Sequence, residues 1–69
     1  SMTNNYSEKL IKLRGEKPQR EIAEAVGIAT STYQMYENGK RVPSDGVKIR
    51  LSEYFGVSVQ ELFFSTEKI

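Results

Sequence analysis

The segment from Thr30 to Arg41 combines an uncharged row of side chains with two adjacent cations. At helical spacing Tyr33 and Tyr36 share one face, and the side chains left on the other face are small, polar or flexible. These outward side chains are Thr30, Ser31, Gln34 and Met35. Gln can make a bidentate contact to adenine, Ser and Thr bond to several bases, and Thr or Met can touch a thymine methyl group. The pattern therefore predicts a helix face that reads base edges in a major groove.

Polar and cationic groups lie at both ends of the unit that runs from Gln19 to Asn38, where phosphates would flank an inserted helix. The start of a helix at Gln19 also offers backbone N–H groups to an anion. The expected phosphate contacts are Gln19, Arg20, Asn38, Lys40 and Arg41. Taken alone, Lys40 and Arg41 could be a solvated loop pair, and Arg20 could be an ordinary surface charge.

The composition argues against catalysis and metal binding. The 69 residues include no Cys and no His, so the chain lacks thiolates, the commonest metal ligand and the commonest general base. A domain of this size buries a small core, which leaves little room for a deep substrate pocket. We therefore expect no enzymatic activity, no metal, no cofactor and no small-molecule ligand.

The charge of the chain is nearly balanced but unevenly distributed. The net charge is +1, yet residues 38–52 carry four cations against one anion, and residues 53–69 carry three anions against one cation. Apolar runs are short, so we expect neither a membrane span nor a secretory signal. The expected location is the cytoplasm, in association with the nucleoid.

Apolar residues recur at helical spacing along the whole chain, and no segment alternates as a strand does. The expected helices cover about residues 5–14, 19–25, 30–38, 45–55 and 59–64. Ser44 is the expected N-cap of the fourth helix, and Ser58 to Glu61 reads as a capping box for the fifth. Gly27 can close the second helix in a left-handed turn. The sequence predicts an all-α fold, a compact five-helix bundle.

Two pairs of aromatic residues could each lie in the core or on the surface. Tyr33 and Tyr36 could stack on bases, as in single-strand binders, but their helical spacing favours the core. Phe63 and Phe64 are adjacent on a helix and cannot both face one core. One of them should point outward, where it could contribute to a dimer surface.

The expected organisation is a single domain over residues 5–64. Residues 1–4 are expected to be a tag scar and a disordered start, and residues 65–69 a flexible tail. Because the chain ends soon after the fifth helix, we expect no attached ligand-sensing or oligomerisation domain.

Several motifs together resemble the phage-repressor and Cro-like helix-turn-helix family, also called the XRE family. They are Leu13-Arg14, Gln19 to Ala23, Gly27-Ile28, Tyr36 to Arg41, Pro43-Ser44 and Phe55 to Phe63. The resemblance covers about residues 6–64. It implies a lambda-repressor-like domain that acts as a sequence-specific double-stranded DNA-binding transcriptional regulator, a repressor. It also implies a homodimer on a palindromic operator, with the helix at about 30–38 in the major groove.

The resemblance further implies individual roles. It assigns phosphate contacts to Gln19 and Asn38, base contacts to the four outward residues of the third helix, and a partly buried ion pair to Arg14 and Glu37. Lys12 could compete with Arg14 for the acid. The family often has Ser or Thr at the positions of Pro18 and Ala29, so two hydroxyl caps are missing here.

A second class of function stays open from the sequence. The domain could be a protein-interaction module of the same fold, such as an antitoxin or an anti-repressor. The acidic C-terminal part and the outward Phe would permit this. The neutral helix face bounded by cations favours DNA.

Overall fold

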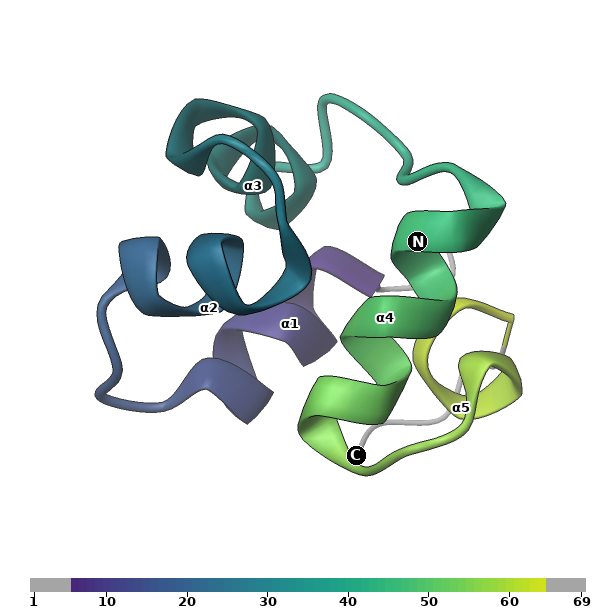
Figure 1. The fold of residues 1–69 in the computed structure, drawn as a ribbon. Helices are drawn as coiled ribbons and strands as arrows, with labels where there is room; N and C mark the ends of the chain where they lie inside the picture. The colour runs from purple at the N-terminus through teal and green to yellow at the C-terminus, as the bar shows by residue number, and fades with distance from the viewer. Residues whose placement is uncertain (1–5, 65–69) are drawn as a thin grey trace.

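A computed structural model describes residues 6–64, and within that range the chain forms five α-helices and no strand. They are α1 (Tyr6–Arg14), α2 (Gln19–Val26), α3 (Thr30–Glu37), α4 (Asp45–Phe55) and α5 (Val59–Phe63). The predicted all-α, five-helix fold is confirmed, and the helix ends fall within one residue of those expected (Figure 1). None of these helices is long and apolar enough to cross a membrane. The expected tag scar (1–4) and tail (65–69) lie outside the described residues.

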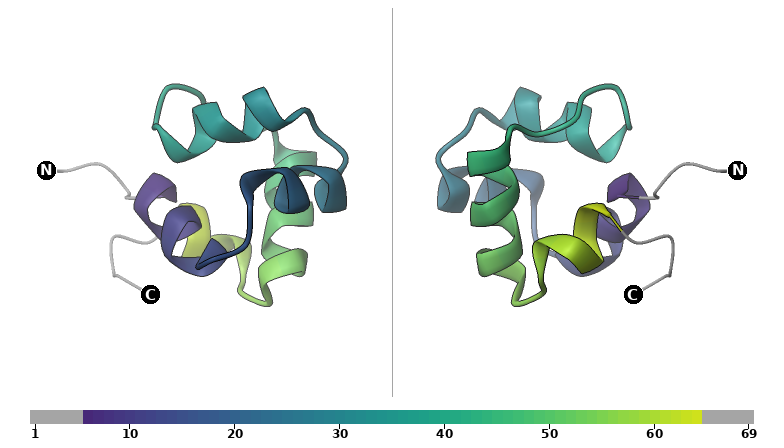
Figure 2. Two further views of the ribbon diagram at one scale, coloured as in Figure 1. Left: turned by 90° about the vertical axis from the view of Figure 1, so that its left-hand side faces the viewer. Right: turned by 90° about the vertical axis from the view of Figure 1, so that its right-hand side faces the viewer.

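The helices pack so that α3 keeps one side open. It packs against α2 and α1, while α4 packs against α2 and α5, and α5 also contacts α1. In both views of Figure 2, α3 lies along the upper edge of the molecule, with α1 and α5 below it. The side of α3 that faces away from the core is therefore free to meet another molecule.

The turn between α2 and α3 is built around Gly27. Its φ of 75° lies in the left-handed region, which costs a residue with a Cβ atom about 1–2 kcal/mol. The N–H of Gly27 donates to the carbonyl of Glu24 at 3.3 Å, and the N–H of Ile28 donates to the carbonyl of Ala23 at 3.0 Å. This pair of bonds is the Schellman arrangement, which satisfies the last carbonyls of α2 and directs the chain into α3.

Among the N-caps of α2 to α5, only that of α5 makes a side-chain hydrogen bond to its helix. Pro18 and Ala29 occupy the N-cap positions of α2 and α3, and neither supplies a side-chain bond. Ser44 is the N-cap of α4, as expected, but its side chain makes no capping bond. The capping box of α5 is confirmed: the Glu61 N–H donates to Ser58 Oγ at 3.0 Å, and the Ser58 N–H donates to Glu61 Oε1 at 3.2 Å.

The core gathers apolar side chains from all five helices. Its buried members are Leu10, Ile22, Ala23, Val26, Tyr33, Tyr36, Val47, Leu51, Leu62 and Phe63. Tyr33 and Tyr36 are 0% and 4% exposed, so they are core residues and are not placed to stack on bases. They hold α3 against α1 and α2, and this fixes which side of α3 faces outward.

Two long basic side chains join helices that are distant in sequence. Arg50 on α4 donates from Nε to the carbonyl of Val26 at 2.9 Å, so it caps the end of α2. Lys9 on α1 is buried, and its Nζ donates to the carbonyl of Glu61 at 2.6 Å. Both contacts join one helix to the backbone of another, and neither was expected from the sequence.

The adjacent phenylalanines divide as predicted. Phe63 is 1% exposed and packs in the core, whereas Phe64 is 56% exposed. The Nζ of Lys48 lies 4.7 Å from the centroid of the Phe64 ring. The outward ring therefore covers the start of α4 without entering the core.

Replacing the two phenylalanines separately should give very different losses of stability. We expect Phe63→Ala to lower the free energy of unfolding by about 3–5 kcal/mol, because it removes a buried ring and leaves a cavity. We expect Phe64→Ala to cost less than about 1 kcal/mol. Urea unfolding followed by circular dichroism measures both, and equal losses would contradict this division between core and surface.

Candidate nucleic-acid interface

The outward face of α3 is formed by uncharged side chains, three of them polar and one a methionine. Ser31 and Gln34 are exposed, and Thr30 and Met35 are half-buried beside them. The opposite face buries Tyr33, Tyr36 and Glu37. The four residues expected to read bases therefore lie on one helix, on the side turned away from the core.

The residues expected to contact phosphates lie at the start of α2 and in the segment that follows α3. Arg20, Asn38, Lys40 and Arg41 are exposed, and Gln19 is half-buried. Arg20 is paired with Glu24 on its own helix at 3.9 Å, and both side chains are about three-quarters exposed. Such a surface pair contributes little stability and leaves the guanidinium accessible.

The loop after α3 is fixed at two points. Gly39 has a φ of 74°, and the N–H of Lys40 donates to the carbonyl of Met35 at 3.0 Å, so α3 ends in a left-handed turn. The hydroxyl of Tyr6 on α1 donates to the carbonyl of Arg41 at 2.9 Å. These bonds hold the backbone of both cations in place while their side chains remain in solvent.

The role of Tyr6 in positioning this loop was not expected from the sequence. The two bonded residues are 35 positions apart, and no local pattern connects them. A tyrosine hydroxyl at the edge of a core usually finds a partner, but the sequence does not say which one.

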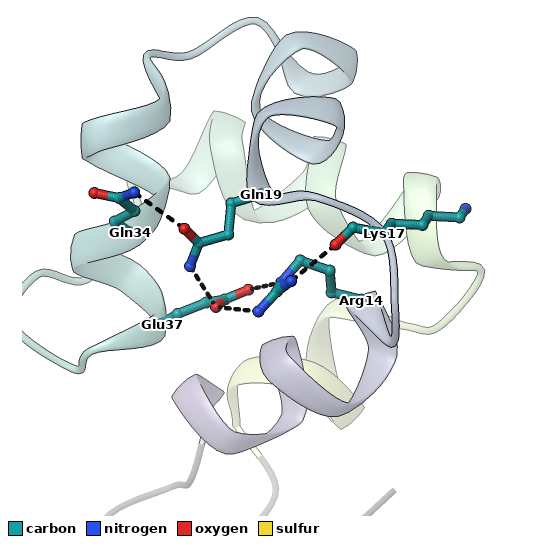
Figure 3. A network of polar contacts seen from close by, with 5 residues as sticks. All are labelled: Arg14, Lys17, Gln19, Gln34 and Glu37. Carbon is teal, nitrogen blue, oxygen red and sulfur yellow. Dashed lines mark hydrogen bonds and ion pairs between the residues drawn. The ribbon is translucent and has the colours of Figure 1, made fainter.

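A buried ion pair connects α1 to α3. Arg14 Nε lies 2.7 Å from Glu37 Oε2, and Arg14 Nη2 lies 3.1 Å from Glu37 Oε1, which is a bidentate contact (Figure 3). The Glu37 side chain is only 3% exposed. Arg14 also donates from Nη1 to the carbonyl of Lys17 at 2.8 Å, so it holds the turn that leads into α2.

Two glutamine side chains extend this contact to the surface of α3. Gln19 Nε2 donates to Glu37 Oε1 at 2.8 Å, and Gln34 Nε2 donates to Gln19 Oε1 at 3.0 Å. Figure 3 shows the series running from Arg14 through Glu37 and Gln19 to Gln34. We call these four side chains the polar relay. It joins a buried charge to a side chain on the outward face.

The relay keeps the Glu37 carboxylate ionised. Burial alone would raise the pKa of this carboxyl, but hydrogen bonding from Arg14, with a smaller contribution from Gln19, lowers the pKa below its usual value. The Tyr33 hydroxyl is buried beside the ion pair and forms no hydrogen bond within residues 6–64. Burial, together with the neighbouring carboxylate, raises the pKa of this phenol, so it stays protonated.

Other charges expected near this site do not join it. Lys12 is exposed on α1 and is not the partner of Glu37, a place that Arg14 takes. Lys17 turns toward α4, where its Nζ is 3.3 Å from the hydroxyl of Tyr54. No group of three or more potential metal-ligating side chains occurs among residues 6–64.

The geometry of two short helices joined by a left-handed glycine turn, with the second one open to solvent, is that of a helix-turn-helix. The family described as Helix-turn-helix matches residues 9–62. The chain belongs to this family. The match covers most of the described helices and confirms the resemblance to phage-repressor and Cro-like domains inferred from the motifs. The second helix of the motif is α3.

A curated relative supports the same assignment. The chain is 33% identical over 64 residues to the "Cryptic phage CTXphi transcriptional repressor RstR" of Vibrio cholerae. The alignment covers 90% of this chain and 58% of the relative, so the chain spans somewhat more than half of the length of that protein. No solved structure gives a significant match.

Removing the charge of Glu37 should change how stability depends on pH. Because the pKa of Glu37 is lower in the folded protein, its contribution is complete above the pKa of the unfolded chain and is lost as pH falls through the folded value. We expect Glu37→Gln to lower the free energy of unfolding by about 1–3 kcal/mol at pH 7. The difference from the original protein should shrink below about pH 4.

Urea unfolding at pH 7, 5, 4 and 3 measures this difference. Glu24→Gln is the matched control, because Glu24 is exposed and only loosely paired. It should change stability little at every pH. A difference for Glu37→Gln that stays constant down to pH 3 would contradict the role of the ionised carboxylate.

Proposed function

We propose that this domain binds double-stranded DNA sequence-specifically and acts as a transcriptional regulator, a repressor. The observation that carries the proposal is the outward face of α3, where Ser31 and Gln34 are exposed near accessible cations at the start of α2 and after the end of α3. A helix with such a face fits the major groove, where neutral polar side chains can bond to base edges. Membership in the helix-turn-helix family and the similarity to a phage repressor support this proposal.

The proposed docking assigns different tasks to the residues around α3. Thr30, Ser31, Gln34 and Met35 read bases. Gln19, Arg20, Asn38, Lys40 and Arg41 contact phosphates on either side. Phosphate contacts set the register of the protein on the duplex, and base contacts supply the discrimination. In this proposal the domain acts in the cytoplasm, on the nucleoid, and has no catalytic role.

We further propose that two copies bind a palindromic operator. The eight residues of α3 span about 12 Å, which is the rise of only three or four base pairs. One such helix reads too few base pairs to select one site in a genome. Two copies related by a two-fold axis would place their helices roughly one turn of DNA apart, about 34 Å.

The surface that supports a second copy is a hollow between α4 and α5. Its volume is about 330 Å³, and it is lined by Asp45, Lys48, Ile49, Val59 and Phe64. Ile49 and Phe64 are about half exposed there. One anion and one cation lie at this hollow, so a copy related by a two-fold axis could oppose Asp45 to Lys48 around an apolar centre. The alternative of a protein-interaction module would use the same surface for a different protein.

Selection of bound duplexes from a random pool tests the function directly. A selected palindrome with half-sites about one helical turn apart is the expected result. Affinity for it should fall with salt by roughly 0.9 log unit per log unit of salt for each phosphate neutralised. Recovery of no preferred duplex, or a response that is flat in salt, would contradict the proposed function.

Arg41→Ala should weaken binding to all duplexes by a similar factor and reduce the salt slope by about 1, because it removes one phosphate contact. Lys12→Ala is the matched control, since Lys12 is an exposed cation on α1, which lies below α3 in Figure 2. It should leave the slope unchanged. Filter-binding titrations at four salt concentrations measure both variants. Equal slopes for the two variants would contradict a phosphate contact from Arg41.

Ile49→Glu should prevent dimer formation without unfolding the domain, because Ile49 is exposed and a carboxylate in the hollow would be repelled by its two-fold mate. Sedimentation at increasing concentration, without DNA and with the selected palindrome, measures this. The expected result is one copy per duplex and at least tenfold weaker binding. An unchanged dimer would place the contact between copies elsewhere.

A further inference from the structure

The polar relay has a fixed direction, and this direction determines which atoms Gln34 offers to a base. An ionised carboxylate has only acceptors, so the Gln19 side chain must turn Nε2 toward Glu37. The Oε1 atom of Gln19 then faces Gln34, which must donate one N–H to it. Each amide is oriented by its neighbour, and the series begins at the buried charge of Glu37 (Figure 3).

The outer end of the relay is left with one acceptor and one donor. Gln34 Oε1 points away from Gln19, as Figure 3 shows, and the second N–H of the amide is also outside the relay. In the major groove adenine presents one donor, at N6, beside one acceptor, at N7. Guanine presents two acceptors, O6 and N7, and would need two donors from the same side chain.

We infer that Gln19 is a specificity-determining residue, because it occupies one N–H of Gln34 and so commits that side chain to adenine over guanine. The inference rests on the proposed binding of α3 in the major groove. Without the Gln19 contact, the Gln34 amide could turn both N–H groups toward guanine. Gln19 therefore links the residue that sets the phosphate register to the residue that reads the base.

Three variants test the inference on duplexes selected by the original protein. Gln34→Ala first identifies the base pair that Gln34 reads, as the position where preference is lost. The affinities for A·T and G·C at this position are then compared. The original protein should prefer A·T by about fivefold or more. Gln19→Met, which keeps the length of the side chain but has no hydrogen-bonding atoms, should reduce that preference to about twofold or less.

Arg20→Met is the matched control, because Arg20 is next to Gln19, is an expected phosphate contact and has no bond to Gln34. It should weaken A·T and G·C duplexes by the same factor. If Gln19→Met behaves in the same way, Gln19 holds only a phosphate and the inference is overturned. A preference for any base other than adenine at the position read by Gln34 would also overturn it.

A measurement without DNA separates this inference from the proposed function. The two Nε2 protons of Gln34 should have NMR shifts displaced from those of an unstructured glutamine in the free protein, and the displacement should largely disappear in Gln19→Met. If the Gln34 amide protons of the original protein have the shifts of an unstructured glutamine, the inference is overturned even if the protein binds DNA. Intact relay signals with no selected duplex would instead count against the proposed function, and the specificity inferred from it would fall as well.

Discussion

The carboxylate of Glu37 is almost completely buried, so its charge must be met by donors from neighbouring helices. Arg14 supplies two hydrogen bonds from α1, and Gln19 supplies one from α2. Because Arg14 is partly exposed, removing one partner of this ion pair should cost about 1–3 kcal/mol, which is still a large share of the stability of a small domain. The arrangement of α1, α2 and α3 is therefore coupled to one charge on the inner side of α3. The outer side of the same helix is oriented by the same contacts.

The lengths of α2 and α3 make this coupling necessary. Each has eight residues, which is too short for a stable isolated helix in water. Their N-caps are Pro18 and Ala29, which provide no side-chain bond to the first turn. What holds α3 is the burial of Tyr33 and Tyr36, together with the ion pair. A helix that packs firmly on one side can present an uncharged and mainly polar opposite side, because that side need not contribute to folding.

Much of this structure could be predicted from the sequence, because its signals are local. Helical spacing of apolar residues, left-handed positions at glycines and the capping box of Ser58 placed the five helices to within one residue. Tertiary contacts made by long polar side chains were not predictable in the same way. The bonds of Tyr6, Lys9 and Arg50 to backbone carbonyls span 35, 52 and 24 residues, and each depends on how helices pack. The direction of the polar relay also requires coordinates, since an amide can present either end.

Because the net charge of the chain is small, the proposed DNA binding depends strongly on contacts from the outward face of α3. A strongly basic domain attracts any duplex, whereas a net charge of +1 provides little sequence-independent attraction. The acids of α2 are partly offset by neighbouring cations, since Glu21 lies 4.0 Å from Lys17 and Glu24 lies 3.9 Å from Arg20. Lys40 and Arg41 then supply positive charge in the loop that follows α3. Because the phosphate contribution is common to right and wrong sites, a small one leaves base contacts a larger share of the total binding free energy. With so little charge to hold it on an arbitrary sequence, such a domain would depend on amides held in the correct orientation, and the relay from Glu37 provides that orientation.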